Sequence, residues 1–191
     1  MKKTLFFIAI TLISLNAFAQ KTDSTALILI DIQYFYFTGG AVELVEPEQA
    51  AQQAKQLLSY FRENNALVVH VRHDFQPGGN IHELVKPCDG EKVITKKDVN
   101  SFLGTDLNNY LKNNNIKYVV LAGMQTHMCL EAGTRAAHDL GYNCTVIADA
   151  CATRDIKYED RIVPAADVHT STLATLQSYA RVIPLERYFK H

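Results

Sequence analysis

The sequence predicts a three-layer α/β protein: a doubly wound, mostly parallel sheet with helices on both faces. Short continuous apolar runs, which are typical of strands buried on both faces, alternate with longer segments whose apolar residues recur at helical spacing. Such alternation implies parallel strands joined by right-handed crossovers. The 191 residues contain no internal repeat and no low-complexity linker, so we expect one domain of ordinary size.

The first 19 residues have the pattern of a secretory signal peptide. Lys2 and Lys3 precede an apolar run at residues 5–15, and the small-x-small sequence AFA follows at residues 17–19. The run is shorter than the roughly 20 residues needed to cross a bilayer, although a retained N-terminal anchor is the alternative. We therefore predict cleavage after the AFA sequence, an exported and periplasmic protein, and a mature domain at residues 20–191.

The charge balance excludes two classes of partner. The formal net charge is −1, which becomes −3 when the two lysines of the signal peptide are removed, and no basic cluster interleaved with aromatic residues occurs. Binding to nucleic acid or to an anionic membrane surface is therefore not expected. The expected partner is a small-molecule substrate, and a homo-oligomer remains open.

The first half of the mature chain predicts a strand, a helix and two strands. Residues 26–30 form a continuous apolar run, as expected for a strand buried on both faces. After Pro47, apolar residues recur at three- and four-residue spacing through residues 50–61, which predicts an amphipathic helix. Two further apolar runs, at residues 67–71 and 93–95, predict strands.

The second half continues the alternation. A short helix is expected at residues 107–111 and a strand at residues 118–121. An Ala-rich helical pattern then opens at Cys129 and is terminated by Gly141, since glycine is common just past a helix end. Three elements complete the chain: a strand at residues 144–148, a helix at residues 165–179 and a strand at residues 182–183.

The four cysteines raise the question of disulfide bonds, because an exported chain meets an oxidising compartment. Cys144 and Cys151 bracket the apolar run at residues 145–148, and an extended strand of that length holds its ends too far apart for pairing. The cysteine spacing matches no metal-binding pattern. We expect free thiols, with Cys88 left open.

Polar residues follow three of the predicted strands. Asp31 follows the first strand, and Lys96 and Lys97 follow the third. Cys129 comes after the fourth, at a helix start. Ligands of such sheets bind beyond the carboxyl ends of the strands, so these side chains should meet there. The alternatives are a structural acid at Asp31, solvated lysines, and a small buried residue at Cys129.

The residue types suggest amide cleavage by a thiol. A helix N-terminus lowers a thiol pKa, so we expect Cys129 to be a reactive thiolate that alkylating reagents label faster than the other three cysteines. Asp31 would accept the thiol proton, and a lysine ammonium would stabilise the thiolate and hold the acid. Backbone N–H groups of the turn at residues 123–125 would stabilise a tetrahedral oxyanion.

Four segments match one known family in order and spacing. They are LIDIQ at residues 29–33, NSFLGTDL at residues 100–107 with Lys96 six residues before Phe102, AGMQTHMC at residues 122–129, and DACA at residues 149–152 after Gly141 and Tyr142. Over nearly the whole mature chain, the sequence resembles the isochorismatase-like cysteine hydrolases, which include nicotinamidases and other amidases.

The resemblance implies a six-stranded parallel sheet and a catalytic triad of Asp31, Lys96 and Cys129. The family spacing to Phe102 selects Lys96 rather than its neighbour. The resemblance also implies oxyanion donors from the backbone N–H groups of Gln125 and Cys129, and a cis peptide bond between residues 124 and 125.

Departures from the family pattern limit the cofactor prediction. The family's nicotinamidases carry a metal-binding Asp-x-His arrangement, but here the aromatic residues 34–37 follow the first catalytic strand. We therefore expect no metal and no other cofactor, and we doubt a nicotinamide substrate. His70, His73 and His82 are interpreted as structural rather than as metal ligands.

The substrate pocket is expected where the aromatic run at residues 34–37 meets the long Pro- and Gly-bearing loop at residues 74–89. Its predicted lining residues are Gln33, Tyr36, Met124 and His127. His127 is two residues from Cys129 and would not share its helix face, so it is not assigned as the base.

These patterns predict a cysteine-dependent hydrolase that cleaves a small amide or related C–N bond through a thioester intermediate. True isochorismatases of this fold lack the nucleophilic cysteine, so Cys129 argues against vinyl-ether hydrolysis. That activity and a non-catalytic small-molecule-binding protein on the same fold are the two alternatives.

Overall fold

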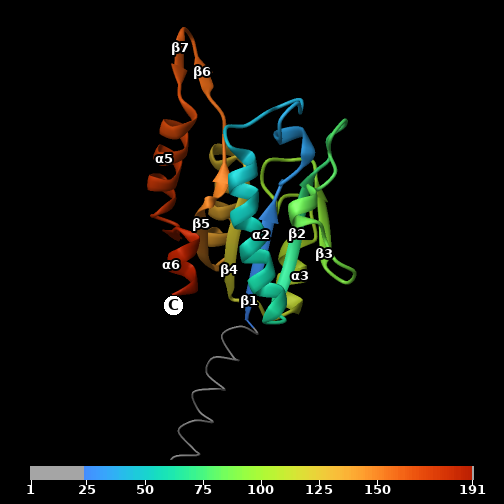
Figure 1. The fold of residues 1–191 in the computed structure, drawn as a ribbon. Helices are drawn as coiled ribbons and strands as arrows, with labels where there is room; N and C mark the ends of the chain where they lie inside the picture. The colour runs from blue at the N-terminus through green and yellow to red at the C-terminus, as the bar shows by residue number, and fades with distance from the viewer. Residues whose placement is uncertain (1–23, 191) are drawn as a thin grey trace, which may run out of the picture.

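The computed structural model describes residues 24–190 of the chain (Figure 1). The predicted signal peptide at residues 1–19 lies outside the described residues and stays a prediction. Within residues 24–190, no helix is both long enough and apolar enough to cross a membrane.

Six parallel strands form the central sheet, in the order β3-β2-β1-β4-β5-β8. Their bounds are Thr25–Ile30 (β1), Leu67–His73 (β2), Lys92–Lys96 (β3), Tyr118–Met124 (β4), Asn143–Ala152 (β5) and Ala180–Ile183 (β8). Every neighbouring pair is parallel, so the prediction of a doubly wound α/β sheet is confirmed. The strand order reverses between β1 and β4, which places the expected ligand site at the carboxyl ends of these two strands.

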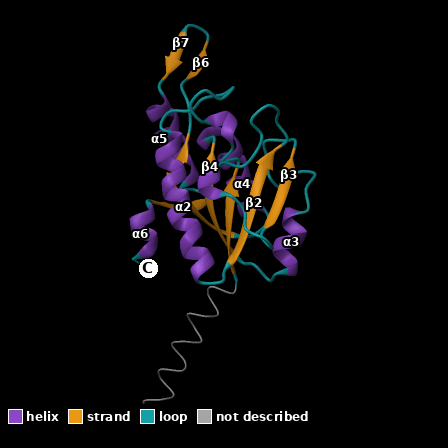
Figure 2. Cartoon of the chain, turned by 45° about the vertical axis from the view of Figure 1, so that its right-hand side comes forward, coloured by secondary structure: helices purple, strands orange, loops and turns teal. Residues whose placement is uncertain are grey.

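Helices cover both faces of the sheet (Figure 2). One face carries α2 (Pro47–Glu63) and α6 (Leu185–Phe189), and the other carries α3 (Leu107–Asn113), α4 (Glu131–Asp139) and α5 (Ala165–Leu176). The side chains of β1 alternate between the two cores: Leu27 and Leu29 pack on the α2 side, and Ile28 and Ile30 on the α3 side. This burial on both faces explains why β1 is a continuous apolar run in the sequence.

All six strands of the main sheet run further than the sequence predicts, β4 and β5 by the most. β4 continues to Met124 and β5 to Ala152, with a register shift between Leu121 and Gly123. Gly123 has a φ of 141°, and a Cβ atom there would lie 2.0 Å from the carbonyl oxygen of Ile30. Glycine therefore allows β4 to approach β1 closely at the edge of the sheet where the polar residues gather.

The sequence reading missed two short elements near the C-terminus. One is a hairpin of β6 (Ile156–Tyr158) and β7 (Arg161–Val163), which projects beyond the carboxyl end of the sheet (Figures 1 and 2). The other is α6, which begins after Pro184. Both were missed because neither carries a long apolar pattern. Helix α5 also ends at Leu176, three residues before the predicted end.

The loop at residues 74–89 packs along the segment that follows β1. The backbone N–H of Phe35 donates to Gly78 O at 3.0 Å, and that of His82 donates to Ile32 O at 2.8 Å. The two contacting segments each contain a single turn of 3-10 helix, at Tyr34–Tyr36 and Glu83–Val85. The loop and the aromatic run are thus one packed unit beside the carboxyl end of β1.

The cysteines are free thiols, as the sequence predicted, and Cys88 also has no disulfide partner in the described part of the chain. Cys88 is exposed, whereas Cys129, Cys144 and Cys151 are buried. The four thiols therefore differ in their access to solvent.

Candidate active site

Asp31 is the residue that β1 delivers to the edge of the sheet. Its side chain is fully buried, and its backbone N–H continues the sheet by donating to Val71 O at 2.9 Å. Its φ is +52°, a left-handed conformation that is uncommon for a residue other than glycine. Backbone strain of this kind is concentrated at functional positions, so the conformation of Asp31 marks this edge of the sheet.

Lys96 ends β3 and reaches into the same place. Ile94 and Lys96 are 5% and 1% exposed, whereas Lys97 is exposed, because side chains alternate along the strand. The Lys96 Nζ atom lies 2.7 Å from Asp31 Oδ2 and 3.3 Å from Cys129 Sγ. It also donates to Asp98 O at 3.1 Å. The structure thus brings Asp31, Lys96 and Cys129 together and leaves Lys97 outside the cluster.

Cys129 lies in a single π-helical turn, Thr126–Leu130, that precedes α4. The sequence predicted a thiol with a lowered pKa at an α-helix start, and that prediction is wrong. The side chain is 4% exposed, and burial together with the negative charge of Asp31 raises the pKa of the Cys129 thiol to about 12, although the Lys96 ammonium opposes the shift. The resting group is therefore a protonated thiol that needs a base.

Asp31 has the properties of that base. Burial raises the pKa of its carboxyl group, while the Lys96 ammonium acts in the opposite direction. Neither carboxylate oxygen has a well-aligned hydrogen bond within the described residues, so the contact with Lys96 is an ion pair, and the Cys129 thiol is the other side chain that interacts with the carboxylate. A buried carboxylate with so few donors gains more from taking a proton than a solvated one does.

His73 is a fourth member of the cluster that the sequence reading assigned only a structural role. It ends β2 and is in register with Lys96 on β3. Its Nδ1 atom lies 3.1 Å from Lys96 Nζ, and because an ammonium only donates, Nδ1 must accept. The sequence predicts that this strand ends at residue 71, two residues before His73, so the strand-end rule does not select His73.

The donor atoms of Asp31, His73 and Cys129 lie within 4.8 Å of one another, a separation at which they could hold a metal ion. The Lys96 ammonium already lies among them, at 2.7, 3.1 and 3.3 Å from the respective atoms. A second cation in the same place would be repelled by that ammonium. These residues therefore do not fit a metal site while Lys96 is charged.

The turn between β4 and the π-helical segment has the backbone geometry that the family resemblance implied. The peptide bond between Met124 and Gln125 is cis. The carbonyl oxygen of Gln125 accepts from the backbone N–H groups of Met128 (3.1 Å) and Leu130 (3.3 Å), which fixes the turn against the helix that carries Cys129. The Gln125 residue is itself buried, at 4% exposed.

Of the four predicted pocket residues, two are packed into the protein interior. Gln33 is fully buried, and its amide bonds to the backbone N–H and carbonyl of His73 (2.7 and 2.9 Å) and to Gly79 O (2.7 Å). Gln33 therefore connects His73 to the loop at residues 74–89 through hydrogen bonds and does not line a pocket. Met124 is fully buried in the core on the α2 side of the sheet.

Of the other two, Tyr36 is also buried and only His127 is partly exposed. Tyr36 is 5% exposed, and burial and then the charge of Cys129 raise the pKa of its hydroxyl group. His127 is half-buried, and its Nδ1 atom lies 2.6 Å from Thr153 Oγ1. Burial and the neighbouring Arg154 lower the pKa of His127, so the imidazole is neutral at neutral pH.

Thr153 and Arg154 directly follow β5 and were not singled out from the sequence. Arg154 is exposed, and its Nε donates to the side-chain Oε1 of Gln125 at 3.2 Å. A neighbouring pair that the sequence also missed is Thr126 with His169, whose Oγ1 and Nδ1 atoms are 2.9 Å apart. The sequence predicts that β5 ends at residue 148, so Thr153 and Arg154 are not expected at a strand end.

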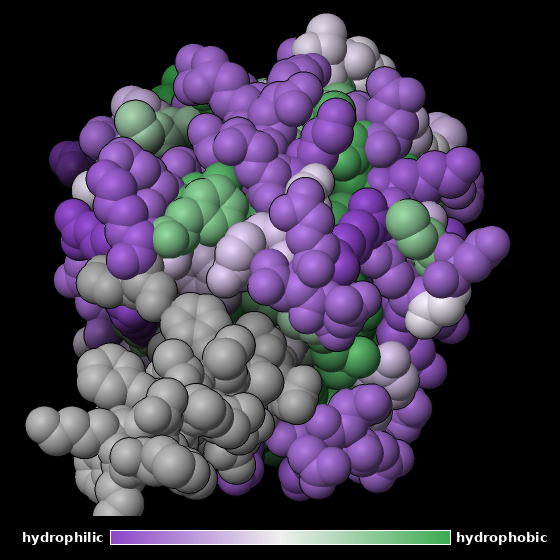
Figure 3. Space-filling model, turned by 60° about the horizontal axis from the view of Figure 1, so that its bottom comes forward, coloured by the Kyte–Doolittle hydropathy of each residue, from purple (hydrophilic) through white to green (hydrophobic). Residues whose placement is uncertain are grey.

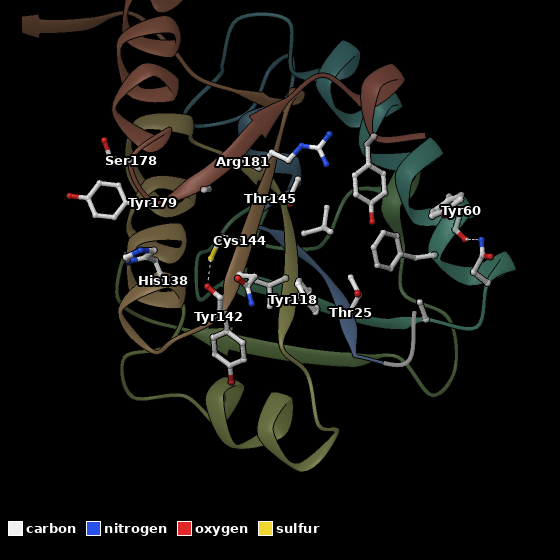
Figure 4. A pocket seen from close by; sticks show the side chains of 18 residues that line it. Thr25, Tyr60, Tyr118, His138, Tyr142, Cys144, Thr145, Ser178, Tyr179 and Arg181 are labelled. Atoms are coloured by element: carbon white, nitrogen blue, oxygen red, sulfur yellow. Dashed lines mark hydrogen bonds between the residues drawn. The ribbon is translucent and has the colours of Figure 1, made fainter. Parts of the chain in front are cut away.

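A large cavity lies at the opposite end of the sheet. It encloses about 510 Å³ and is lined by the starts of the strands, including Thr25, Tyr118, Cys144 and Arg181 (Figure 4). The outer face near this end is largely hydrophilic, with separate apolar spots, where grey atoms do not cover it (Figure 3). Because Asp31, Lys96 and Cys129 are at the carboxyl ends of the strands, this cavity is not an extension of their site.

Comparison with known proteins finds a matching family model, similar sequences and a similar crystal structure. An isochorismatase-domain model matches residues 25–183. An uncharacterized isochorismatase family protein of Bacillus subtilis, YddQ, is 45% identical over 179 residues, which are 87% of this chain and 99% of that protein. A crystal structure from Oleispira antarctica, assigned to the isochorismatase hydrolases, has a TM-score of 0.85 at 43% identity and covers 88% of this chain and 97% of that one. Maleamate amidohydrolase of Pseudomonas putida is 30% identical over 155 residues, 68% of this chain and 72% of that enzyme.

Proposed function

This chain belongs to the isochorismatase family of hydrolases, and from that premise we propose that it is a cysteine hydrolase that cleaves a small amide or related C–N bond. The observation that carries the proposal is the contact between Lys96 Nζ and both Asp31 Oδ2 and Cys129 Sγ in a buried site. A thiol, an acid and an ammonium within contact distance supply a nucleophile, a base and an electrostatic anchor.

In the first half-reaction, the Cys129 thiol gives its proton to Asp31 while Sγ bonds to the amide carbonyl carbon. The negative charge that develops on the carbonyl oxygen is stabilised by the backbone N–H groups of Gln125 and Cys129. When the tetrahedral adduct collapses, the C–N bond breaks and Asp31 returns the proton to the nitrogen, so ammonia or an amine leaves and a thioester remains on Sγ.

In the second half-reaction, Asp31 takes a proton from water as the oxygen attacks the thioester carbon. The C–S bond then breaks, the proton passes to sulfur, and a carboxylic acid leaves. Lys96 stays charged throughout, because it compensates the negative charge that moves between Asp31 and Cys129. The raised pKa values of the acid and the thiol suit this shuttle, since neither group holds a stable charge on its own in the buried site.

One relative supports the bond type. The maleamate amidohydrolase that resembles this chain is, by its name, an amide hydrolase on the same family scaffold. Isochorismatase-type hydrolysis of a vinyl ether needs no thiol, so it leaves the position and contacts of Cys129 without a role.

The proposal is tested by ammonia release from a panel of small amides. The wild type and Cys144→Ala should release ammonia at similar rates, because Cys144 lies at the other end of β5, whereas Cys129→Ala should be inactive with its fold intact. Hydrolysis of a vinyl ether that survives in Cys129→Ala would support the first alternative. Binding without turnover of any panel compound would support a non-catalytic protein.

We also propose that the chain is exported, on the evidence of the charged, apolar and small-residue pattern at residues 1–19. Mass spectrometry of the native protein should find a mature chain that begins at Gln20. Full-length protein in the cytoplasmic fraction would contradict export without affecting the proposed chemistry.

A further inference from the structure

His73 touches the candidate triad, yet the proposed chemistry assigns it no step. It ends β2, in register with Lys96 at the end of β3. Its Nδ1 atom lies 3.1 Å from Lys96 Nζ, and one of its ring nitrogens lies within 4.8 Å of the donor atoms of Asp31 and Cys129. The imidazole is therefore an immediate neighbour of the reacting groups.

Four acceptor atoms surround the Lys96 ammonium, which has three N–H bonds. Two of them belong to the reacting groups: Asp31 Oδ2 at 2.7 Å and Cys129 Sγ at 3.3 Å. The other two are His73 Nδ1 and Asp98 O, each at 3.1 Å. This second pair takes no part in the making or breaking of bonds.

The reacting pair of acceptors changes during the proposed reaction. In the tetrahedral adduct, Asp31 carries the thiol proton and Cys129 Sγ is bonded to the carbonyl carbon, so neither group is negatively charged. The negative charge is then on the carbonyl oxygen. A buried ammonium that loses its anionic partner still needs hydrogen-bond acceptors, because an unsatisfied buried charge is costly. His73 Nδ1 and Asp98 O are the acceptors that the chemistry leaves unchanged.

The main chain of His73 is held independently of the triad. The Gln33 side chain accepts from the backbone N–H of His73 at 2.7 Å and donates to its carbonyl oxygen at 2.9 Å. The Gln33 amide also donates to Gly79 O at 2.7 Å. These bonds do not involve the imidazole, so a substitution of the His73 side chain leaves them in place.

We propose that His73 is a positioning residue for Lys96: its Nδ1 atom accepts a hydrogen bond from the ammonium and keeps the ammonium beside Cys129 while Asp31 is protonated. The role requires a neutral imidazole with its hydrogen on Nε2, because a protonated ring has no acceptor. The catalytic part of this inference rests on the proposed amidase function, whereas the hydrogen bond can be tested without it.

Two substitutions separate the acceptor from the bulk of the side chain. His73→Leu removes the acceptor, whereas His73→Asn offers its side-chain oxygen near the place of Nδ1. His73→Leu should lose about 10- to 100-fold in kcat on an amide, the size expected for a hydrogen bond to a charged group, with little change in KM or unfolding temperature. His73→Asn should recover most of that loss. Equal losses in the two variants, or wild-type activity in His73→Leu, would overturn the inference.

A double-mutant cycle shows whether His73 acts through Lys96. In a Lys96→Met background, which lacks the ammonium, His73→Leu should change kcat by no more than about twofold. Losses that multiply would overturn the inference. His70→Leu is the matched control, because His70 lies on the same strand and contacts Glu91 at 2.9 Å. It should lower the unfolding temperature and keep kcat within about twofold. A loss of kcat as large as that of His73→Leu would also overturn the inference.

A protein that hydrolyses no amide would contradict the proposed function instead. The hydrogen bond is then decided by nitrogen NMR of the histidine rings at neutral pH, in the wild type and in Lys96→Met. His73 should carry its hydrogen on Nε2, and its Nδ1 resonance should move when the ammonium is removed, while the resonances of His70 stay in place. An unchanged Nδ1 resonance of His73, or a hydrogen on that atom in the wild type, would overturn the inference.

Discussion

Glu91 and Asp31 are two carboxylates that lie next to strands of the central sheet, and their surroundings are opposite. Glu91, just before β3, is bonded by Arg62 Nε and Nη2 (2.7 and 2.8 Å), by His70 Nε2 (2.9 Å) and by the backbone N–H of Cys88 (2.8 Å). Burial favours a higher pKa for Glu91, but these hydrogen bonds outweigh it and lower the pKa to about 2. Asp31, just after β1, has an ion pair with Lys96 and no aligned hydrogen bond among the described residues, and burial raises its pKa.

The difference separates a structural acid from a chemical one. Glu91 has a full set of donors, so its charge is stable and ties the segment before β3 to α2 through Arg62. Asp31 has too few hydrogen-bond donors to stabilise its negative charge fully, so it can exchange a proton with a neighbouring thiol. Composition alone does not distinguish the two residues, because the distinction lies in how many donors each acid meets.

Removing each acid should give opposite phenotypes. Asp31→Asn should keep the fold and lose about 10³-fold or more in kcat, because the base of the mechanism is gone. Glu91→Gln should keep kcat within about twofold but lose about 2 kcal/mol of unfolding free energy, because charged hydrogen bonds are lost. Steady-state kinetics and urea unfolding on both variants make the measurement. A Glu91→Gln enzyme that is folded but inactive would contradict the assignment of Glu91 as a structural acid.

The adjacent residues Lys96 and Lys97 allow a second comparison, between a buried lysine at the site and an exposed one outside it. Lys96→Ala should lose about 10²-fold in activity, because it leaves the Asp31 charge and the developing thiolate without a cation. Lys97→Ala should stay within about twofold, since its side chain is exposed. Amide hydrolysis by the two variants is compared under the same conditions. The reverse result would mean that β3 delivers the other residue to the site.

The sequence predicts the main sheet and the three central residues of the candidate site, but it does not predict the hairpin. The apolar runs identify all six strands of the main sheet, because burial on both faces leaves a continuous signal. The strand-end rule and the family spacing pointed to Asp31, Lys96 and Cys129, which the structure brings together. The sequence contained no comparable signal for the β6–β7 hairpin, whose strands are three residues long and charged.

The parts that failed depend on burial or on the extent of a strand. The thiol pKa of Cys129 was predicted from its place at a helix start, but depth in the protein controls the shift. Arg154 was hidden because β5 runs four residues beyond the predicted end. His73 was interpreted as structural, whereas it lies in register with Lys96 and its Nδ1 atom contacts the Lys96 ammonium. None of these facts is local to a short stretch of sequence.

The cysteines of the two regions should differ in reactivity. Cys88, beside Glu91, is exposed, whereas Cys129, beside Asp31, is buried with a pKa raised to about 12. Iodoacetamide at neutral pH should therefore label Cys88 at least about tenfold faster than Cys129, because the thiolate is the reacting form. Peptide mass spectrometry over a time course gives both rates. Faster labelling of Cys129 would restore the pre-formed thiolate that the sequence predicted.

The pH dependence of stability should follow Glu91. Its folded-state pKa is lowered to about 2, so the unfolded chain binds more protons between that value and the ordinary glutamate pKa of about 4.3. The stabilisation is therefore fully present above about pH 5 and is lost as the pH falls towards 2. Urea unfolding of the wild type and Glu91→Gln from pH 7 down to acid should show a difference that shrinks over this window. A difference that is constant with pH would exclude the charged form as its source.

The most direct test of the proposed thioester is intact-protein mass spectrometry after rapid acid quench of the enzyme with an amide that it is hydrolysing. We expect a transient mass increase equal to the acyl group, located on the peptide that contains Cys129, which decays as the carboxylic acid appears and is absent in Cys129→Ala. Undiminished amide hydrolysis by Cys129→Ala, with no acyl adduct on the wild-type Cys129, would contradict it.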